Sequence, residues 1–143
     1  MFSTSHIHPM VVHFPIALIL TGFVFDVVYL FFKREQCLSK AGLYLMILGT
    51  LGAGLAFASG HLFTDELNEG EVARVFNLHE NWALITVIVM TLCSIVRIYL
   101  MRAGKGQTTL KWVSFGLYLA GAIAVSLTGF MGGNMVYKYI MGI

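Results

Sequence analysis

Four long apolar stretches constrain this 143-residue chain more than any other feature. They cover residues 10–32, 41–63, 78–101 and 110–135, and each is long enough to cross a hydrocarbon core of about 30 Å as an α-helix. Only 11% of the residues are charged, whereas a soluble domain carries about 25%. Short connections favour an up-down-up-down bundle of neighbouring antiparallel helices. The sequence therefore predicts an all-α integral membrane four-helix bundle, in one domain over 1–143 with no visible internal repeat.

The charged residues of the connections predict the orientation of these helices. The first and third connections are basic, whereas the second is acidic except for Arg74. Because basic connections stay on the cytoplasmic side, both termini should lie on the outer side of a bacterial inner membrane. The net charge of +2 is too small to argue for a nucleic acid partner. The basic residues in or around the first and third connections are Lys33, Arg34, Lys40, Arg97, Arg102, Lys105 and Lys111, and the acidic residues of the second are Asp65, Glu66, Glu69 and Glu71.

Local signals mark the ends of several stretches. Pro9 suits the first turn of a helix, where its missing N–H costs nothing, and Pro15 is expected to kink the first helix near His13. Asn77 can cap the third helix, with Glu80 reaching back from three residues later as in a capping box. No positively charged segment precedes the first stretch, so we expect it to remain in the mature protein rather than to be cleaved as a signal peptide.

All five histidines fall at the outer ends of the stretches, which makes this face the best candidate for chemistry. Imidazole is the commonest side-chain metal ligand, and an ionisable group at the edge of hydrocarbon is costly without a partner. His13 on the first helix and His79 on the third should lie at similar depth, because these helices run in the same direction. We expect them to be the axial ligands of a b-type haem, bound without the CxxCH motif of c-type attachment, which the chain lacks. The histidines are His6, His8, His13, His61 and His79.

His61 and His8 are secondary ligand candidates, which leaves one haem and two haems both open. Gly52, Ala56 and Gly60 belong to a stripe of small residues along the second stretch. The simplest role of such a stripe is close helix packing in lipid. The same missing side chains would also make room for a flat macrocycle, so these three residues are candidate contacts of the haem.

Two other interpretations use the same histidines. In the first, the chain is a structural or assembly subunit of a larger membrane complex, or a homo-oligomer, and its imidazoles only cap helices and bind interfacial water. In the second, they bind zinc or copper, which both accept imidazole. The chain has no nucleophile elbow, HExxH or glycine-rich phosphate loop. An electron-transfer protein that meets a quinone or a periplasmic cytochrome is therefore a better expectation than an enzyme.

Two charged residues lie about a turn or more inside the apolar stretches. Asp26 is about two turns from the cytoplasmic end of the first stretch, and Arg97 is about one turn from that end of the third. An unpaired charge at this depth is expensive. The sequence therefore predicts a structural ion pair between Asp26 and Arg97, which would hold the first and third helices side by side.

Two motifs resemble the signatures of a known family. Residues 8–18 read HPMVVHFPIAL, and residues 132–137, after the fourth stretch, read GGNMVY. With His79 at the start of the third stretch, they resemble a family of small bacterial membrane proteins that is classed as a domain of unknown function and has four predicted spans. Members often follow the tyrosine with a basic residue, a histidine and a glycine, whereas this chain has Lys138, Tyr139 and Ile140. Relatives fused to c-type cytochromes imply a place in periplasmic electron transfer.

Overall fold

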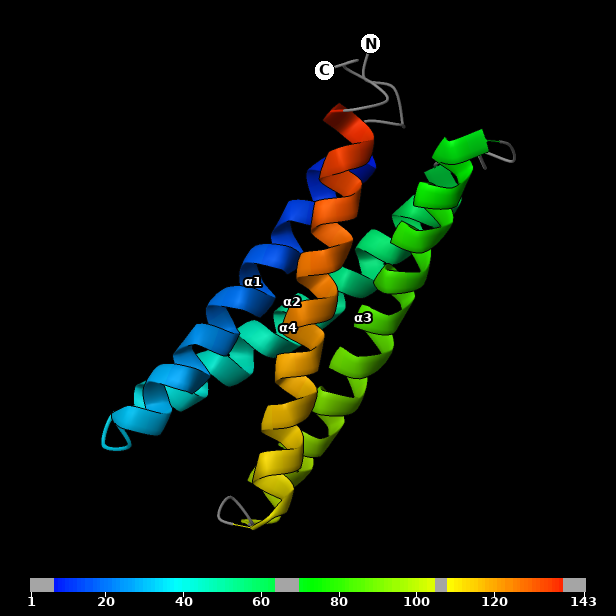
Figure 1. Ribbon diagram of the computed structural model, residues 1–143. Helices are drawn as coiled ribbons and strands as arrows, with labels where there is room; N and C mark the ends of the chain where they lie inside the picture. Colours follow the sequence, from blue (N-terminus) through cyan, green and yellow to red (C-terminus); the bar gives the residue numbers. More distant parts are fainter. Residues whose placement is uncertain (1–6, 64–69, 105–107, 138–143) are drawn as a thin grey trace.

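A computed structural model describes residues 7–63, 70–104 and 108–137, and these form four helices. They are α1 (Ile7–Phe31), α2 (Gln36–Phe63), α3 (Gly70–Arg102) and α4 (Leu110–Met135), and the described residues contain no strand. The first residues of α1 and the last residues of α4 lie at one end of the bundle, and the α1–α2 and α3–α4 turns lie at the other (Figure 1). We call these the histidine end and the turn end. The predicted all-α four-helix fold is confirmed.

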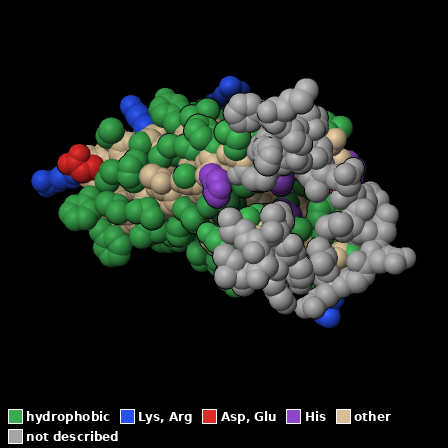
Figure 2. Space-filling model, turned by 90° about the horizontal axis from the view of Figure 1, so that it is seen from above, with side chains coloured by type: hydrophobic (Ala, Val, Ile, Leu, Met, Phe, Trp, Pro, Cys, Tyr) green, Lys and Arg blue, Asp and Glu red, His purple; other side chains and the backbone are tan. Residues whose placement is uncertain are grey.

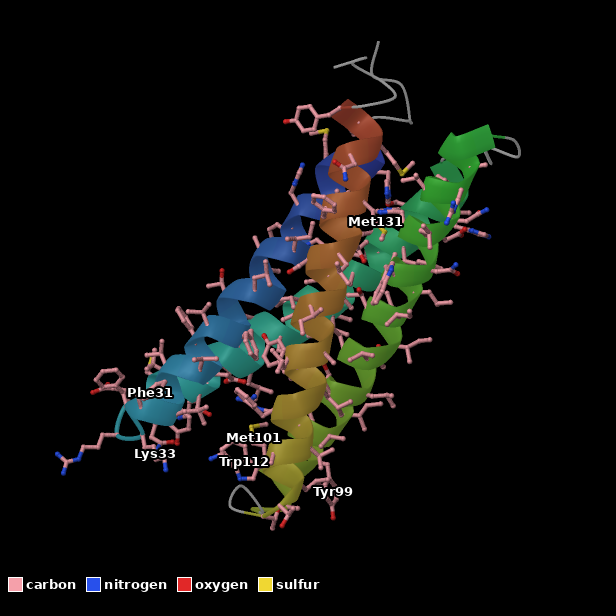
Figure 3. The ribbon with its side chains drawn as sticks, in the orientation of Figure 1. Phe31, Lys33, Tyr99, Met101, Trp112 and Met131 are labelled. Atoms are coloured by element: carbon pink, nitrogen blue, oxygen red, sulfur yellow. The ribbon has the colours of Figure 1, made fainter. Side chains whose placement is uncertain are left out.

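Each helix carries a segment that is long and apolar enough to cross a membrane. Only a minority of each segment is buried inside the protein, so most of its apolar side chains face outward. Phe31, Tyr99 and Trp112 lie toward the turn end and Met131 toward the other end (Figure 3). Such an apolar exterior is compatible with surrounding lipid, where a helix forms all its backbone hydrogen bonds within itself.

Helix α3 begins earlier than the sequence signals suggest. It starts at Gly70, so Asn77 lies inside the helix and the capping box predicted with Glu80 is wrong. The segment 71–76 contains Ala, Glu and Arg, which are good helix formers. Ala73 is also buried, so this extension packs against the rest of the protein. Propensity and packing together carry α3 about two turns beyond its apolar segment.

Helices α1 and α2 pack closely because glycines of α2 face side chains of α1. A Cβ added to Gly49 would lie 2.7 Å from Ile19, and one added to Gly52 would lie 3.4 Å from Pro15. Helix α1 continues through Pro15, which is buried at this contact. Helices α1 and α2 form the first hairpin and α3 and α4 the second, in which Gly121 of α4 faces the buried Met90 of α3 in the same way. Glycine at these positions lets two backbones approach, which is the usual basis of helix association in lipid.

The two hairpins are related by an internal repeat of contacts. A shift of 71 residues carries α1 onto α3, and a shift of 72 carries α2 onto α4. Ile19 packs against Gly49 in the first hairpin, and Met90 packs against Gly121 in the second. The repeat is hard to see in the sequence because only some of the equivalent positions hold the same residue. Equivalent pairs are His8 and His79, Ile19 and Met90, Asp26 and Arg97, Met46 and Tyr118, Gly49 and Gly121, and Gly60 and Gly132.

Candidate functional site: two imidazoles between the hairpins

His8 of α1 and His79 of α3 meet at the histidine end of the bundle. Their ring centroids are 6.3 Å apart, and the ring planes are nearly perpendicular at 88°. Both side chains are half-buried. Figure 2 looks onto this end and shows histidine side chains there. Each hairpin therefore contributes one imidazole to a shared site.

The ring of His79 is held by helix α4. Its Nδ1 lies 3.0 Å from the carbonyl oxygen of Thr128. A carbonyl oxygen only accepts hydrogen bonds, so Nδ1 carries the hydrogen and donates it. Gly132, one turn further along α4, leaves room for the ring, because a Cβ there would lie 3.1 Å from the His79 Cε1. The neutral ring is thereby fixed in the tautomer whose Nε2 has a free lone pair.

The ring of His8 is held by helix α2 in an equivalent way. Ser59 donates its hydroxyl hydrogen to the carbonyl oxygen of Ala56, at 2.8 Å. The Ser59 oxygen then accepts from the Nδ1 of His8, at 3.0 Å. Gly60 lies against this ring, since an added Cβ would be 2.9 Å from the His8 Cε1. In neutral His8 the hydrogen is therefore also on Nδ1, and Nε2 carries the lone pair.

Burial and the neighbouring imidazole keep His8 neutral. Removal from water lowers the pKa of His8 below its ordinary value of 6.5, the nearby His79 lowers it further, and hydrogen bonding toward the Ala56 backbone acts in the opposite direction. A neutral imidazole is the form that binds a metal. Both rings thus combine a neutral Nε2 with an Nδ1–H anchored on the bundle, which is the arrangement typical of metal-binding histidines.

The partner of His79 is therefore His8, whereas the sequence predicts His13. His13 is exposed on the outside of α1. It lies five residues after His8, which is about 140° around a helix with 3.6 residues per turn. Because α1 can turn only one of these faces toward α3, its seat on α2 decides between them. His6 lies outside the described residues.

His61 lies on the outer rim of the same end, apart from the His8–His79 contact. Its side chain is 66% exposed, and its Nδ1 lies 3.1 Å from the Glu80 Oε1. Phe57 stacks on the His61 ring with centroids 6.4 Å apart. The small residues of α2 lie between helices: Gly52 faces Pro15, Gly60 faces His8, and Ala56 is buried. Their contacts in the described structure are those of close packing against α1.

Near the turn end, Arg97 forms the ion pair with Asp26 that the sequence predicts. The guanidinium donates to both carboxylate oxygens, with Nη2 to Oδ1 at 2.6 Å. Asp26 is 4% exposed, and a Cβ on Gly42 would lie 2.5 Å from its Oδ1. Two parallel hydrogen bonds make this a strong and directional contact.

The donor set of the site is two imidazoles, and it is compatible with a group that brings the rest of its own ligands. A structural zinc site takes four ligands from the protein. Haem iron carries four porphyrin nitrogens and takes its axial ligands from side chains such as histidine. Sequence analysis missed Ser59 and the Thr128 carbonyl as anchors of the rings. The equal spacing of His8 from Asp26 and of His79 from Arg97 is a sequence signal that favours a contact between His8 and His79, once the Asp26–Arg97 pair is predicted.

Neither a curated protein nor a solved structure matches this chain. A family model described as a predicted membrane protein (DUF2231) matches residues 4–143, which is nearly the whole chain. The resemblance expected from the motifs at the two ends of the chain is confirmed at the level of the family. The chain is a four-helix membrane protein that belongs to the DUF2231 family.

Proposed function

We propose that His8 and His79 are the axial ligands of a b-type haem and that the protein transfers electrons at the outer face of a bacterial inner membrane. The observation that carries this proposal is the meeting of the two rings, one from each hairpin, with both Nδ1 atoms anchored and neither Nε2 atom hydrogen-bonded to a described residue. The near-symmetry of the two hairpins supports it, because two like ligands of one centre each need an equivalent anchor, and α2 and α4 provide these anchors.

The side chains of this site bind and orient, and they carry out no bond chemistry. A bound haem supplies a one-electron couple, whose potential depends on axial ligands, hydrogen bonds and burial. The hydrogen bond from His79 to the Thr128 carbonyl and that from His8 to Ser59 fix the ring orientation and increase the basicity of each Nε2. Fully buried side chains fill the middle of the bundle, namely Ile19, Met46, Met90, Cys93 and Tyr118.

The position of the site suggests its partners. Because the filled middle separates the site from the turn end, electrons would enter and leave on the histidine side of the membrane. The basic residues near the turn end support a periplasmic location of the histidine end, because basic connections stay on the cytoplasmic side. A quinol in the lipid and a soluble cytochrome in the periplasm are the donor and acceptor that this location favours.

Absorption spectra of four alanine variants test the proposal. Protein purified from a haem-replete host should be red, with a Soret band that sharpens on reduction and a pyridine haemochrome. His8→Ala and His79→Ala should each lose the low-spin spectrum. His13→Ala and His61→Ala are matched controls, because these imidazoles are exposed at the same end, and they should keep it. Colourless wild-type protein, or loss of the spectrum in His13→Ala instead, would contradict the proposal.

A structural or assembly subunit is the second candidate, and the packing of the rings favours it. Each imidazole already has a hydrogen bond and a glycine against it. Among the described residues, every buried side-chain nitrogen or oxygen has a hydrogen-bond partner. This candidate requires colourless protein that co-purifies with a larger complex and tolerates His79→Ala. Zinc or copper in stoichiometric amount without iron would instead favour a metal site of another kind.

A further inference from the structure

Two contacts between α1 and α3, one a ring contact and the other an ion pair, lie at opposite ends of these helices. His8 and Asp26 both belong to α1, and their partners His79 and Arg97 both belong to α3. Helices α1 and α3 run in the same direction, but they lie diagonally across the bundle and not side by side as the sequence predicts, because each packs mainly against α2 and α4. The two contacts therefore join one pair of helices at two levels across the middle of the bundle.

The spacing of the residues in these two contacts places them on one face of each helix. Eighteen residues separate His8 from Asp26, and eighteen separate His79 from Arg97. At 3.6 residues per turn and 1.5 Å per residue, this spacing equals about five whole turns and about 27 Å. Whichever rotation of α1 points Asp26 at α3 therefore also points His8 at α3, and the same holds for α3.

The Asp26–Arg97 ion pair is well suited to hold that rotation. Asp26 is buried and Arg97 engages both of its oxygens, so rotation or sliding of either helix would break a hydrogen bond. Gly42 of α2 lies directly behind the carboxylate, which leaves Asp26 little freedom to follow a moving partner. Two charges separated within hydrocarbon are costly, so small rotations are strongly resisted.

We propose that Asp26 and Arg97 are positioning residues for the distant imidazole pair, because their ion pair holds the face of α1 that its packing on α2 turns inward at a fixed rotation and height relative to α3. The part of this inference that concerns haem rests on the proposed function. A geometric part does not: loss of the pair loosens the relative position of the two helices at the histidine end, whether or not a cofactor is present.

Spin-label distances test the geometric part. Labels on Met10→Cys and Asn81→Cys report the α1–α3 distance beside the site, since both positions are exposed. Cys37→Ser removes the exposed native thiol, and Cys93 is buried. In the Asp26→Asn/Arg97→Gln background, we expect the distance distribution to become at least about twofold wider. The charge-swapped Asp26→Arg/Arg97→Asp protein should recover part of the narrow distribution.

A matched control breaks a different polar contact between the hairpins. Thr50 of α2 and Ser94 of α3 lie 3.0 Å apart through their hydroxyl oxygens, so Thr50→Val/Ser94→Ala removes a contact that does not involve α1. This control should leave the label distances unchanged. If the neutral Asp26/Arg97 variant fails to insert, Arg97→Lys, which keeps the charge but loses one parallel hydrogen bond, carries the same test. A distribution of wild-type width in these variants, or equal broadening in the control, would overturn the inference.

The spectrum separates this inference from the proposed function. If wild-type protein is red, the neutral variant should also show a shifted midpoint potential and broadened low-spin resonances, with the control unaffected. If wild-type protein is colourless, the proposed function fails while the label distances still decide the positioning role. If the protein is red but loss of the ion pair changes neither the label distances nor the midpoint potential, the positioning role alone is overturned.

Discussion

Gly60→Ala is a sharp test of the imidazole site, because the added methyl group reaches a ligand without removing one. The new Cβ would lie 2.9 Å from the His8 Cε1, whereas ordinary contact begins at 3.4 Å. The ring must therefore retreat by about 0.5 Å, which exceeds the tolerance of about 0.2 Å for a metal–ligand distance. The same shift would lengthen the 3.0 Å hydrogen bond to Ser59 to its limit.

The stability of Gly60→Ala should change little, which separates this variant from a simple folding defect. Weakening one hydrogen bond costs about 0.5–1.5 kcal/mol. Replacing glycine by alanine inside a helix contributes about 1 kcal/mol in the opposite direction. We therefore expect an unfolding free energy within about 1 kcal/mol of wild type, together with at least tenfold weaker haem binding. Haem titration and unfolding in mild detergent measure the two quantities on one preparation.

Three other glycines make this prediction a graded series. An added Cβ at Gly132 would lie 3.1 Å from the His79 Cε1, so Gly132→Ala should weaken haem binding less than Gly60→Ala. Gly54 and Gly133 have nothing within 4 Å of an added Cβ, so alanine there should leave binding unchanged. Wild-type affinity in Gly60→Ala, or an equal loss in Gly133→Ala, would refute the argument that these glycines make room for the rings.

Three further predictions concern the ion pair, the pH dependence and the orientation. Arg97→Leu leaves Asp26 buried without its partner and should cost about 3–5 kcal/mol of unfolding free energy in detergent; replacing Asp26 by leucine as well should recover most of this loss. Because burial lowers the pKa of His8 below 6.5, the unfolded chain binds more protons just below that pH, so the His8 contribution is present above pH 6.5 and is lost as the pH falls further. His8→Gln should flatten this acid-side slope in unfolding measurements. In intact cells, a membrane-impermeant maleimide should not label Cys37, whereas in inverted vesicles it should label Cys37 and spare buried Cys93.

Specific outcomes would contradict each of these predictions. A double leucine variant as unstable as Arg97→Leu would mean that the unpaired carboxylate is not the source of the cost. An unchanged acid-side slope in His8→Gln would show that another group sets the pH dependence. Labelling of Cys37 from outside intact cells would place the basic turns in the periplasm and reverse the predicted orientation.

The parts of this protein that the sequence predicts depend on local hydropathy or on arrangements whose alternatives cost much free energy. The four spans follow from length and hydropathy, because a helix that crosses lipid needs about 20 consecutive apolar residues whatever its neighbours are. The pairing of Asp26 with Arg97 follows from the cost of an unpaired charge at that depth. The start of α3 was harder to predict, because Asn77 and Glu80 form a plausible cap inside a segment that tertiary packing keeps helical.

The identity of the imidazole pair depends on the rotation of α1 about its own axis. The sequence by itself determined that histidines gather at one end, since that follows from their positions along four spans. The tertiary structure decided that His8 rather than His13 meets His79, because Gly49, Gly52 and Gly60 seat α1 on α2 with one face turned inward. The Asp26–Arg97 pair holds that same face toward α3. Such a rotation is a property of packed surfaces, and hydropathy along a single helix does not record it.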